Sequence, residues 1–192
     1  MEYNKEKREI KLYKKLSELD KLVLDFINIL KKHVDYVIIS GYISILLGRS
    51  RATEDVDLFI KRISFEKLLK LYEELKTNGF ECLNTEKPEE IFSYLNSRLA
   101  IRFSRKGKPI PNFEIKFPKR IIDEETFSDF IIVKMQEGEL KISSLERQIV
   151  FKRYYLKSDK DIEDALHIEE IFKNKLDYNK INKLKRIVEN IK

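Results

Sequence analysis

The hydrophobic positions of the chain change their spacing several times, and each spacing predicts a type of element. Between residues 5 and 32 apolar side chains recur every three or four positions, which predicts a long helix. The apolar run at residues 36–39 predicts a buried strand, and residues 42–47 predict a short helix that ends at Gly48. Residues 54–61 alternate between apolar and polar side chains, as in a half-buried strand.

The rest of the chain predicts strands followed by helices. Ser64 is the expected N-cap of a helix that runs to about residue 78. Further strands are expected at residues 98–104, 112–117, 130–136 and 139–142, the last two joined by a turn at Glu137-Gly138. Helices are expected at residues 144–156, 159–172 and 179–191. This order predicts an α+β protein in three parts: an N-terminal helical segment (1–33), a core (34–142) and a C-terminal helical region (143–192).

Two acids interrupt the strand predicted at residues 54–61. Asp55 and Asp57 lie on one face of such a strand, because side chains alternate between its two faces. Like charges side by side repel each other and are costly to bury unpaired, so we expect a positive partner. Glu114 is a third acid, centred in the apolar strand at residues 112–117. Three carboxylates from two strands could hold one or two Mg²⁺ ions, which prefer oxygen ligands and share them with substrate phosphates.

Composition narrows the classes of function. Of the 192 residues, 42% are hydrophobic and 38% are charged, which indicates a folded protein. The net charge of +6 comes from 39 basic and 33 acidic residues spread along the chain, so it is weak evidence for a nucleic-acid partner. A single cysteine excludes an internal disulfide, and two histidines make a Cys/His zinc site untenable. The sequence has neither a signal-peptide pattern nor the roughly 20 apolar residues of a membrane span, so we expect a cytoplasmic protein with no membrane partner.

Two motifs resemble those of a known superfamily. Ser40-Gly41, Gly48, Arg51-x-Thr53 and Asp55-x-Asp57 resemble, in residue type and spacing, the signature of the polymerase-beta-like nucleotidyltransferases. The resemblance is greatest to the branch that holds the abortive-infection toxin-type and minimal prokaryotic nucleotidyltransferases. The C-terminal half resembles a second pattern of that branch through Lys152, Lys160, Asp161 and Asp164. Together the two motifs cover about residues 37–171.

The resemblance implies a nucleotidyltransferase fold, a mixed sheet flanked by helices with a C-terminal helical region. It implies transfer of a nucleotide from an NTP to an acceptor hydroxyl on RNA, tRNA included, or on protein. Mg²⁺ or Mn²⁺ would be held by Asp55, Asp57 and Glu114, and Lys152 would reach the triphosphate. The implied substrate-binding residues are Ser40, Gly41, Arg51, Thr53, Lys160, Asp161 and Asp164. Some members of the branch are toxins, so a cognate antitoxin is an implied partner.

The residues also leave structural alternatives open. Glu114 could form an ion pair with Lys116 or Arg102, and Arg51 could form a salt bridge with Asp55. Ser40 stands where the signature has a glycine, and Glu114 is longer than the usual aspartate. Two other functions are therefore considered: a catalytically silent module that binds nucleotide or RNA, and a regulatory subunit that docks through its long N-terminal helix.

Overall fold

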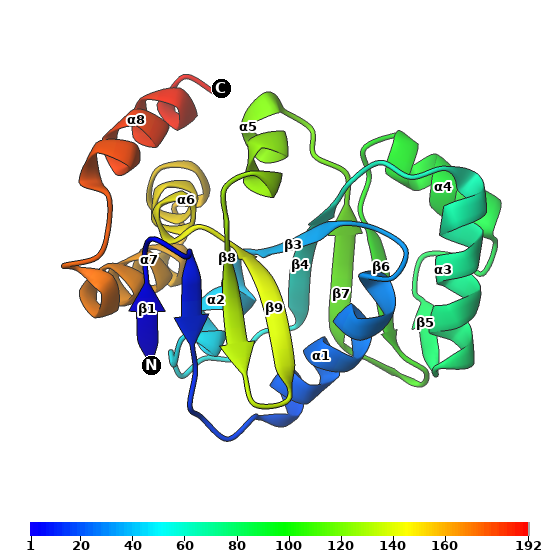
Figure 1. The fold of residues 1–192 in the computed structure, drawn as a ribbon. Coiled ribbons are helices and arrows are strands. Elements are labelled where there is room, and N and C mark those ends of the chain that lie inside the picture. The colour runs from blue at the N-terminus through cyan, green and yellow to red at the C-terminus, as the bar shows by residue number, and fades with distance from the viewer. Residues whose placement is uncertain (192) are drawn as a thin grey trace.

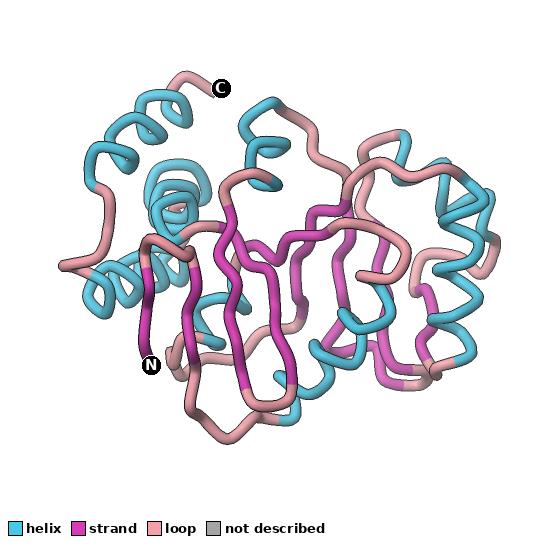
Figure 2. Tube along the Cα trace, in the orientation of Figure 1, coloured by secondary structure: helices cyan, strands magenta, loops and turns pink. Residues whose placement is uncertain are grey.

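A single mixed sheet crosses the molecule and carries most of its core. The structure is a computed structural model in which residues 1–191 are described. Figure 2 shows the strands side by side through the middle, with helices around them. In order across the sheet, the strands described are β1 (Glu2–Asn4), β2 (Glu9–Lys11), β8 (Phe130–Met135), β9 (Gly138–Ser143), β3 (Tyr36–Ile39), β4 (Asp55–Ile60), β7 (Lys108–Lys116), β6 (Ile101–Arg105) and β5 (Phe80–Cys82). The pairs β2–β8, β9–β3 and β4–β7 are parallel, and the other neighbours are antiparallel.

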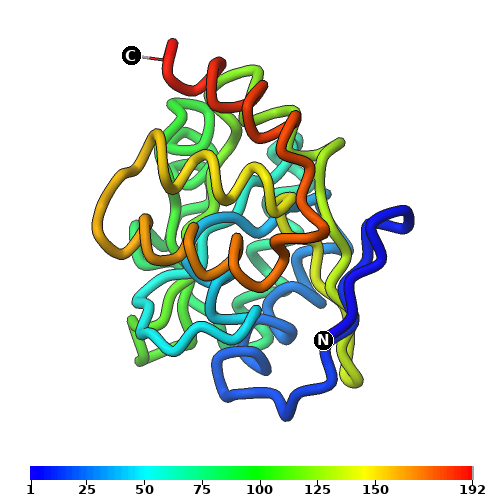
Figure 3. The backbone as a smooth tube through the Cα atoms, turned by 90° about the vertical axis from the view of Figure 1, so that its left-hand side faces the viewer, coloured from blue at the N-terminus to red at the C-terminus, as the bar shows by residue number. Residues whose placement is uncertain are grey.

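The helices gather at two ends of the sheet and on one of its faces. In Figure 1, α3 and α4 lie together at one side and the C-terminal helices at the other, where the view of Figure 3 looks straight at them. Their bounds are α1 (Glu18–Leu30), α2 (Gly41–Leu46), α3 (Phe65–Thr77), α4 (Pro88–Asn96), α5 (Ile121–Glu124), α6 (Leu145–Val150), α7 (Asp159–Phe172) and α8 (Tyr178–Glu189). A 3₁₀ turn, η1 (Glu125–Phe127), follows α5, and a π-helix, η2 (Phe151–Leu156), continues α6. Among residues 1–191 no helix has the length and apolar character needed to cross a membrane.

Local sequence explains the elements that frame the site. In β4, Val56, Leu58 and Ile60 are buried while Asp55 and Asp57 face the other side of the sheet, as their alternation predicts. The Ser64 side chain caps α3, which begins and ends within a residue or so of its predicted bounds. The predicted hairpin β8–β9 is present, with its turn one residue earlier than the expected Glu137-Gly138, because Gly138 already pairs with Met135. The predicted α+β class with a mixed sheet is therefore confirmed.

Aromatic packing holds β7 beside β4. Phe26 of α1 stacks on Phe113 of β7, with ring centroids 3.9 Å apart and an interplanar angle of 4°. Phe80 of β5 meets Phe26 edge-on at 5.2 Å. These buried rings fix the strand that carries Glu114 on the opposite face.

The long N-terminal helix predicted for residues 5–32 is wrong in its first half. Residues 2–11 form the β1–β2 hairpin, and β2 adds to the sheet beside β8. Ile10 is buried between Glu9 and the exposed Lys11, a strand-like alternation that the helical spacing of Leu12 and Leu16 obscured. The helix starts at the capping box of Ser17 and buries Val23, Phe26, Ile27 and Leu30 in the core. In the described chain there is thus no long docking helix of the kind considered for a regulatory subunit.

Candidate active site

The two aspartates of β4 open into a cavity of about 540 Å³. Asp55 and Asp57 lie on the same face of the strand, and both line this cavity. The opposite wall comes from the segment after β7 and from α6 and η2 in the helical region. Its charged side chains are mainly basic: Lys119, Arg120, Arg147 and Lys152. The cavity therefore places two acids opposite a cationic wall.

A lysine occupies the space between two of the predicted metal ligands. Strand register sets Glu114 of β7 directly beside Asp57 of β4. The ammonium Nζ of Lys116 lies 2.9 Å from Asp57 Oδ1 and 2.9 Å from Glu114 Oε1. On the far side, Arg102 of β6 donates to Glu114 Oε2 at 2.8 Å. Negative and positive side chains thus alternate across three strands. Glu114 forms ion pairs with both Lys116 and Arg102, the structural alternative considered for it from the sequence.

The pKa shifts of Asp57 and Glu114, the two acids that share Lys116, have opposite directions. Burial raises the pKa of Asp57 above its ordinary value; Lys116 opposes the rise, and the carboxylates of Asp55 and Glu114 add to it. Burial also acts to raise the pKa of Glu114, but Lys116 and Arg102 outweigh it and the pKa falls. For Lys116 burial acts to lower the pKa, and the two carboxylates raise it instead. One lysine is shared by two acids, and at Asp57 it does not outweigh burial and the neighbouring carboxylates.

This charge distribution allows a test of whether the residues fit a divalent ion. Asp55 has no hydrogen-bond or ion-pair partner for its carboxylate among the described residues, and Asp57 beside it is short of positive charge. These two fit a cation with oxygen ligands that is shared with substrate phosphates. Glu114 fits less well, because both its oxygens are engaged and it does not line the cavity. Across residues 1–191 no three His, Cys, Asp or Glu side chains are grouped so that they could hold a metal ion.

The Ser40-Gly41 turn is shaped by its neighbours. Ser40, at the edge of the cavity, has φ of 66°, in the left-handed region that favours glycine. Gly41 opens α2, and a Cβ placed there would lie 2.7 Å from Nη2 of Arg51. Gly41 therefore makes room for the guanidinium of Arg51, and its role toward a phosphate stays a prediction.

Arg51 is held by the helical region rather than by Asp55, so the alternative of an Arg51–Asp55 salt bridge is wrong. Arg51 Nη1 lies 2.6 Å from Oδ2 of Asp164, a fully buried carboxylate on α7. Lys152, only 1% exposed, donates to the same oxygen at 2.7 Å and to Asp161 Oδ1 at 3.0 Å. Arg49 donates to the other oxygen of Asp164. Arg51, from the first motif that resembles the superfamily signature, thus meets Lys152 and Asp164, from the second, in one buried cluster at the side of the cavity.

The remaining predicted substrate-binding residues, Thr53 and Lys160, do not line the cavity. Thr53 donates its hydroxyl to the backbone carbonyl of Asp55 at 2.9 Å, which braces the start of β4. Lys160 is exposed and outside the cavity lining, and its backbone carbonyl accepts a hydrogen bond from Arg49.

Sequence reasoning missed part of the cationic wall. Arg120 lies over the ring of Tyr155, 4.6 Å from its centroid, and both line the cavity. They are distant in sequence, so no local spacing relates them. The sequence does place Lys116 on the same face of β7 as Glu114, because the two are separated by one residue. Its contact with Asp57 depends on which strands are neighbours, which the local sequence does not indicate.

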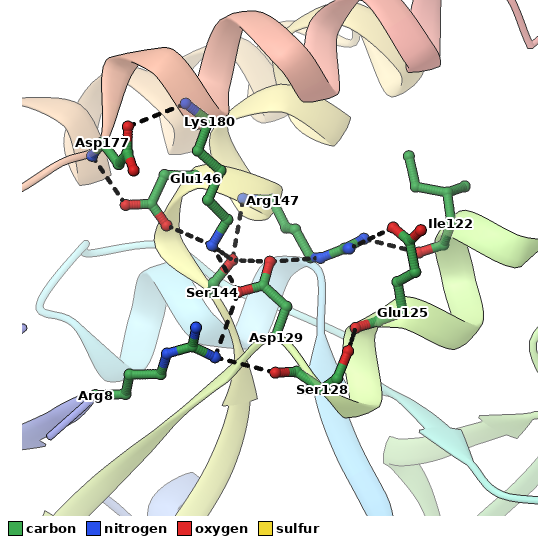
Figure 4. A network of polar contacts seen from close by, with 10 residues as sticks. All are labelled: Arg8, Ile122, Glu125, Ser128, Asp129, Ser144, Glu146, Arg147, Asp177 and Lys180. Carbon is green, nitrogen blue, oxygen red and sulfur yellow. Dashed lines mark hydrogen bonds and ion pairs between the residues drawn. The ribbon is translucent and has the colours of Figure 1, made fainter. Parts of the chain in front are cut away.

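A polar network fixes the helix that carries this wall. Arg147 of α6 donates from Nε to Asp129 Oδ2 at 2.7 Å, and Lys180 of α8 donates to Asp129 Oδ1 at 2.6 Å. Ser144 donates to the same carboxylate at 3.0 Å. Figure 4 shows Asp129 at the centre, with Arg8 approaching from the N-terminal hairpin. The C-terminal helices are thereby tied to the start of β8.

Comparison with solved structures identifies the fold. The chain is similar to an antigenic nucleotidyltransferase-like protein from Paracoccidioides brasiliensis, with a TM-score of 0.50 and 16% identity over 89% of this chain and 87% of that one. It is also similar to the antibiotic-resistance factor ANT(2'')-Ia, with a TM-score of 0.52 and 14% identity over 87% of this chain and 89% of that one. No protein-family model and no curated protein matches the chain. At these identities the likeness establishes the nucleotidyltransferase fold that the sequence predicted.

Proposed function

We propose that the chain is a metal-dependent nucleotidyltransferase that moves a nucleotide from an NTP to an acceptor hydroxyl on RNA, tRNA included, or on protein. The observation that carries the proposal is the pair Asp55 and Asp57, side by side on β4 and facing a cavity with a cationic wall. The nucleotidyltransferase fold that the chain shares with the two solved structures supports the proposal.

The side chains of the cavity suit the separate parts of an NTP. Asp55 and Asp57 would hold Mg²⁺ or Mn²⁺, which when bound supplies positive charge to the triphosphate. Lys119 and Arg120 bring further positive charge to the same cavity, where they can donate charge-assisted hydrogen bonds to phosphate. The ring of Tyr155, an exposed residue, offers apolar surface for a base.

Lys152 and its partners have a supporting place in this proposal. Lys152 is among the residues that line the cavity, and its ammonium is held by Asp161 and Asp164. Lys152 would therefore contribute to the cationic wall from a fixed position, with Arg51 behind it on the same carboxylate. The lysine is expected to slow transfer when lost, without abolishing it.

The experiment is incubation of the protein with each labelled NTP, Mg²⁺ or Mn²⁺, and total cellular RNA and protein. Wild type should label one acceptor class, and Asp57→Asn should reduce labelling by a factor of about 10² or more, because it removes a metal-binding charge with little change of shape. Asp25→Asn makes the same change at an exposed ion pair with Arg105 and should label normally. Labelling that survives Asp57→Asn would contradict the proposal.

A silent binding module is the second candidate, and the pairing of Glu114 favours it. In that case NTP or RNA binds the cavity but no acceptor is labelled by wild type or by Asp57→Asn. Nucleotide binding without turnover in every metal and acceptor tested would support this candidate over the enzyme.

A toxin role with a cognate antitoxin is a finer proposal that rests on the resemblance. Induced expression should then arrest growth, and Asp57→Asn should relieve the arrest. Unimpaired growth during wild-type expression would count against a toxin but not against nucleotide transfer.

A further inference from the structure

The charged row across β4, β7 and β6 has an unusual composition for a metal site. Its acids are Asp55, Asp57 and Glu114, and its bases are Lys116 and Arg102. Three negative and two positive charges leave one unit of negative charge. This excess negative charge lies at Asp55 and Asp57, because each carboxylate oxygen of Glu114 accepts a hydrogen bond from a cationic side chain.

Lys116 and a bridging metal ion exclude each other. The ammonium lies 2.9 Å from one oxygen of Asp57 and 2.9 Å from one oxygen of Glu114. A Mg²⁺ ion bound to the same two oxygens at about 2.1 Å would need the same place. Two adjacent cations would also repel each other in a partly buried site. Lys116 therefore occupies the position at which Glu114 would otherwise bind a metal ion.

We infer that Lys116 takes the place of a second metal ion, so that the site binds one divalent cation on Asp55 and Asp57. Glu114 then acts as a positioning residue that holds the ammonium, and Arg102 holds Glu114 in turn. Lys116 lines the cavity with part of its side chain exposed, so its charge is available to a phosphate there. This inference rests on the proposed function for the identity of the site, and it concerns how many ions that site takes.

Isothermal titration with Mn²⁺ alone, supported by electron paramagnetic resonance of the bound ion, counts the ions. Wild type should bind one Mn²⁺ per chain and Asp57→Asn none. Lys116→Met frees the oxygens of Asp57 and Glu114 and should raise the count to two. Adding Glu114→Gln to Lys116→Met should return it to one, because the second ion then loses a carboxylate. Lys141→Met is the control, since it removes a strand lysine paired with Asp35 outside the cavity and should leave one ion bound.

Glu114→Gln alone keeps the inference testable if Lys116→Met fails to fold. With Lys116 in place, this variant should bind Mn²⁺ within about threefold of wild type, because Glu114 contacts Lys116 and neither aspartate. Loss of a residue that coordinates the ion, or that hydrogen-bonds a coordinating carboxylate, would weaken binding by about tenfold or more. Two ions in wild type, an unchanged count in folded Lys116→Met, or a tenfold loss in Glu114→Gln would each overturn the inference.

The outcome is separable from that of the proposed function. One ion in wild type and two in Lys116→Met, without any nucleotide transfer, would support the inference and reject the enzyme. Nucleotide transfer by a wild type that binds two ions would support the enzyme and reject the inference.

Discussion

At the scale of single residues, Ser40 holds a backbone conformation that its side chain disfavours. Its φ of 66° and ψ of −141° are values that glycine adopts without strain. We predict that Ser40→Gly raises the free energy of unfolding by about 1 kcal/mol, or roughly 2–4 °C in Tm for a chain of this size. Thermal melts followed by circular dichroism measure this directly.

The matched control for Ser40→Gly is Ser93→Gly. Ser93 is exposed inside α4, where glycine costs about 0.5–1 kcal/mol through lost backbone entropy, so Tm should fall. If both substitutions lowered Tm, the turn at Ser40 would not be strained.

Asp57 is an acid whose charge costs stability in the folded protein. Burial, with Asp55 and Glu114 nearby, raises its pKa in spite of Lys116, so the folded state binds the proton more readily than the unfolded state. The cost is present at neutral pH and disappears as pH falls below the ordinary value of 3.8. We predict that Asp57→Asn is more stable than wild type to urea at pH 7, and that the difference shrinks on acidification.

Loss of stability in Asp57→Asn at pH 7 would contradict that prediction and would mean that Lys116 fully compensates the carboxylate. The expected combination, a more stable protein with less transfer, is a trade-off typical of active sites.

At the scale of elements, one carboxylate of α7 joins the helical region to the loop before β4. Asp164 is fully buried and is shared by Arg49, Arg51 and Lys152. Its removal would leave neighbouring cations short of a partner. We predict that Asp164→Asn lowers the free energy of unfolding by about 3–5 kcal/mol, measured by urea denaturation.

Glu163→Gln is the control for Asp164→Asn, because Glu163 also pairs with Arg49 but its side chain is 63% exposed. It should cost less than about 1 kcal/mol, as exposed ion pairs do. Equal effects of the two variants would show that burial of Asp164 is not what matters.

The elements also show what sequence can and cannot predict here. The β4 strand and the β8–β9 hairpin followed from alternation and a turn signal, which are local properties. The N-terminal hairpin was missed because Leu12 and Leu16 fit a helical spacing and no turn dipeptide separates its strands. In the site, the shared face of Asp55 and Asp57 followed from the strand period. The pairing of Arg51 with Asp164 depends on tertiary packing between distant segments and has no local signal.

At the scale of the whole molecule, the network around Asp129 joins the sheet to the C-terminal helices. Arg147 of α6 and Lys180 of α8 both meet the Asp129 carboxylate, which sits just before β8. Of these two helices α6 carries part of one cavity wall, so the network couples the shape of the site to the stability of the fold. We therefore expect the core and the helical region to unfold in a single transition.

Asp129 should make that coupled stability sensitive to acid. Burial acts to raise the pKa of Asp129, but Lys180 and Arg147 outweigh it and hold the pKa below the ordinary 3.8. An acid with a lowered pKa stabilises the fold above its unfolded value, and this contribution is lost as pH falls through the folded value. We predict that Asp129→Asn lowers the free energy of unfolding at pH 7 by about 1–3 kcal/mol, because buried donors lose a charged acceptor. Urea titrations should show the gap between variant and wild type closing below pH 4. A gap that persists unchanged at low pH would mean that lost packing, rather than lost charge, is the cause.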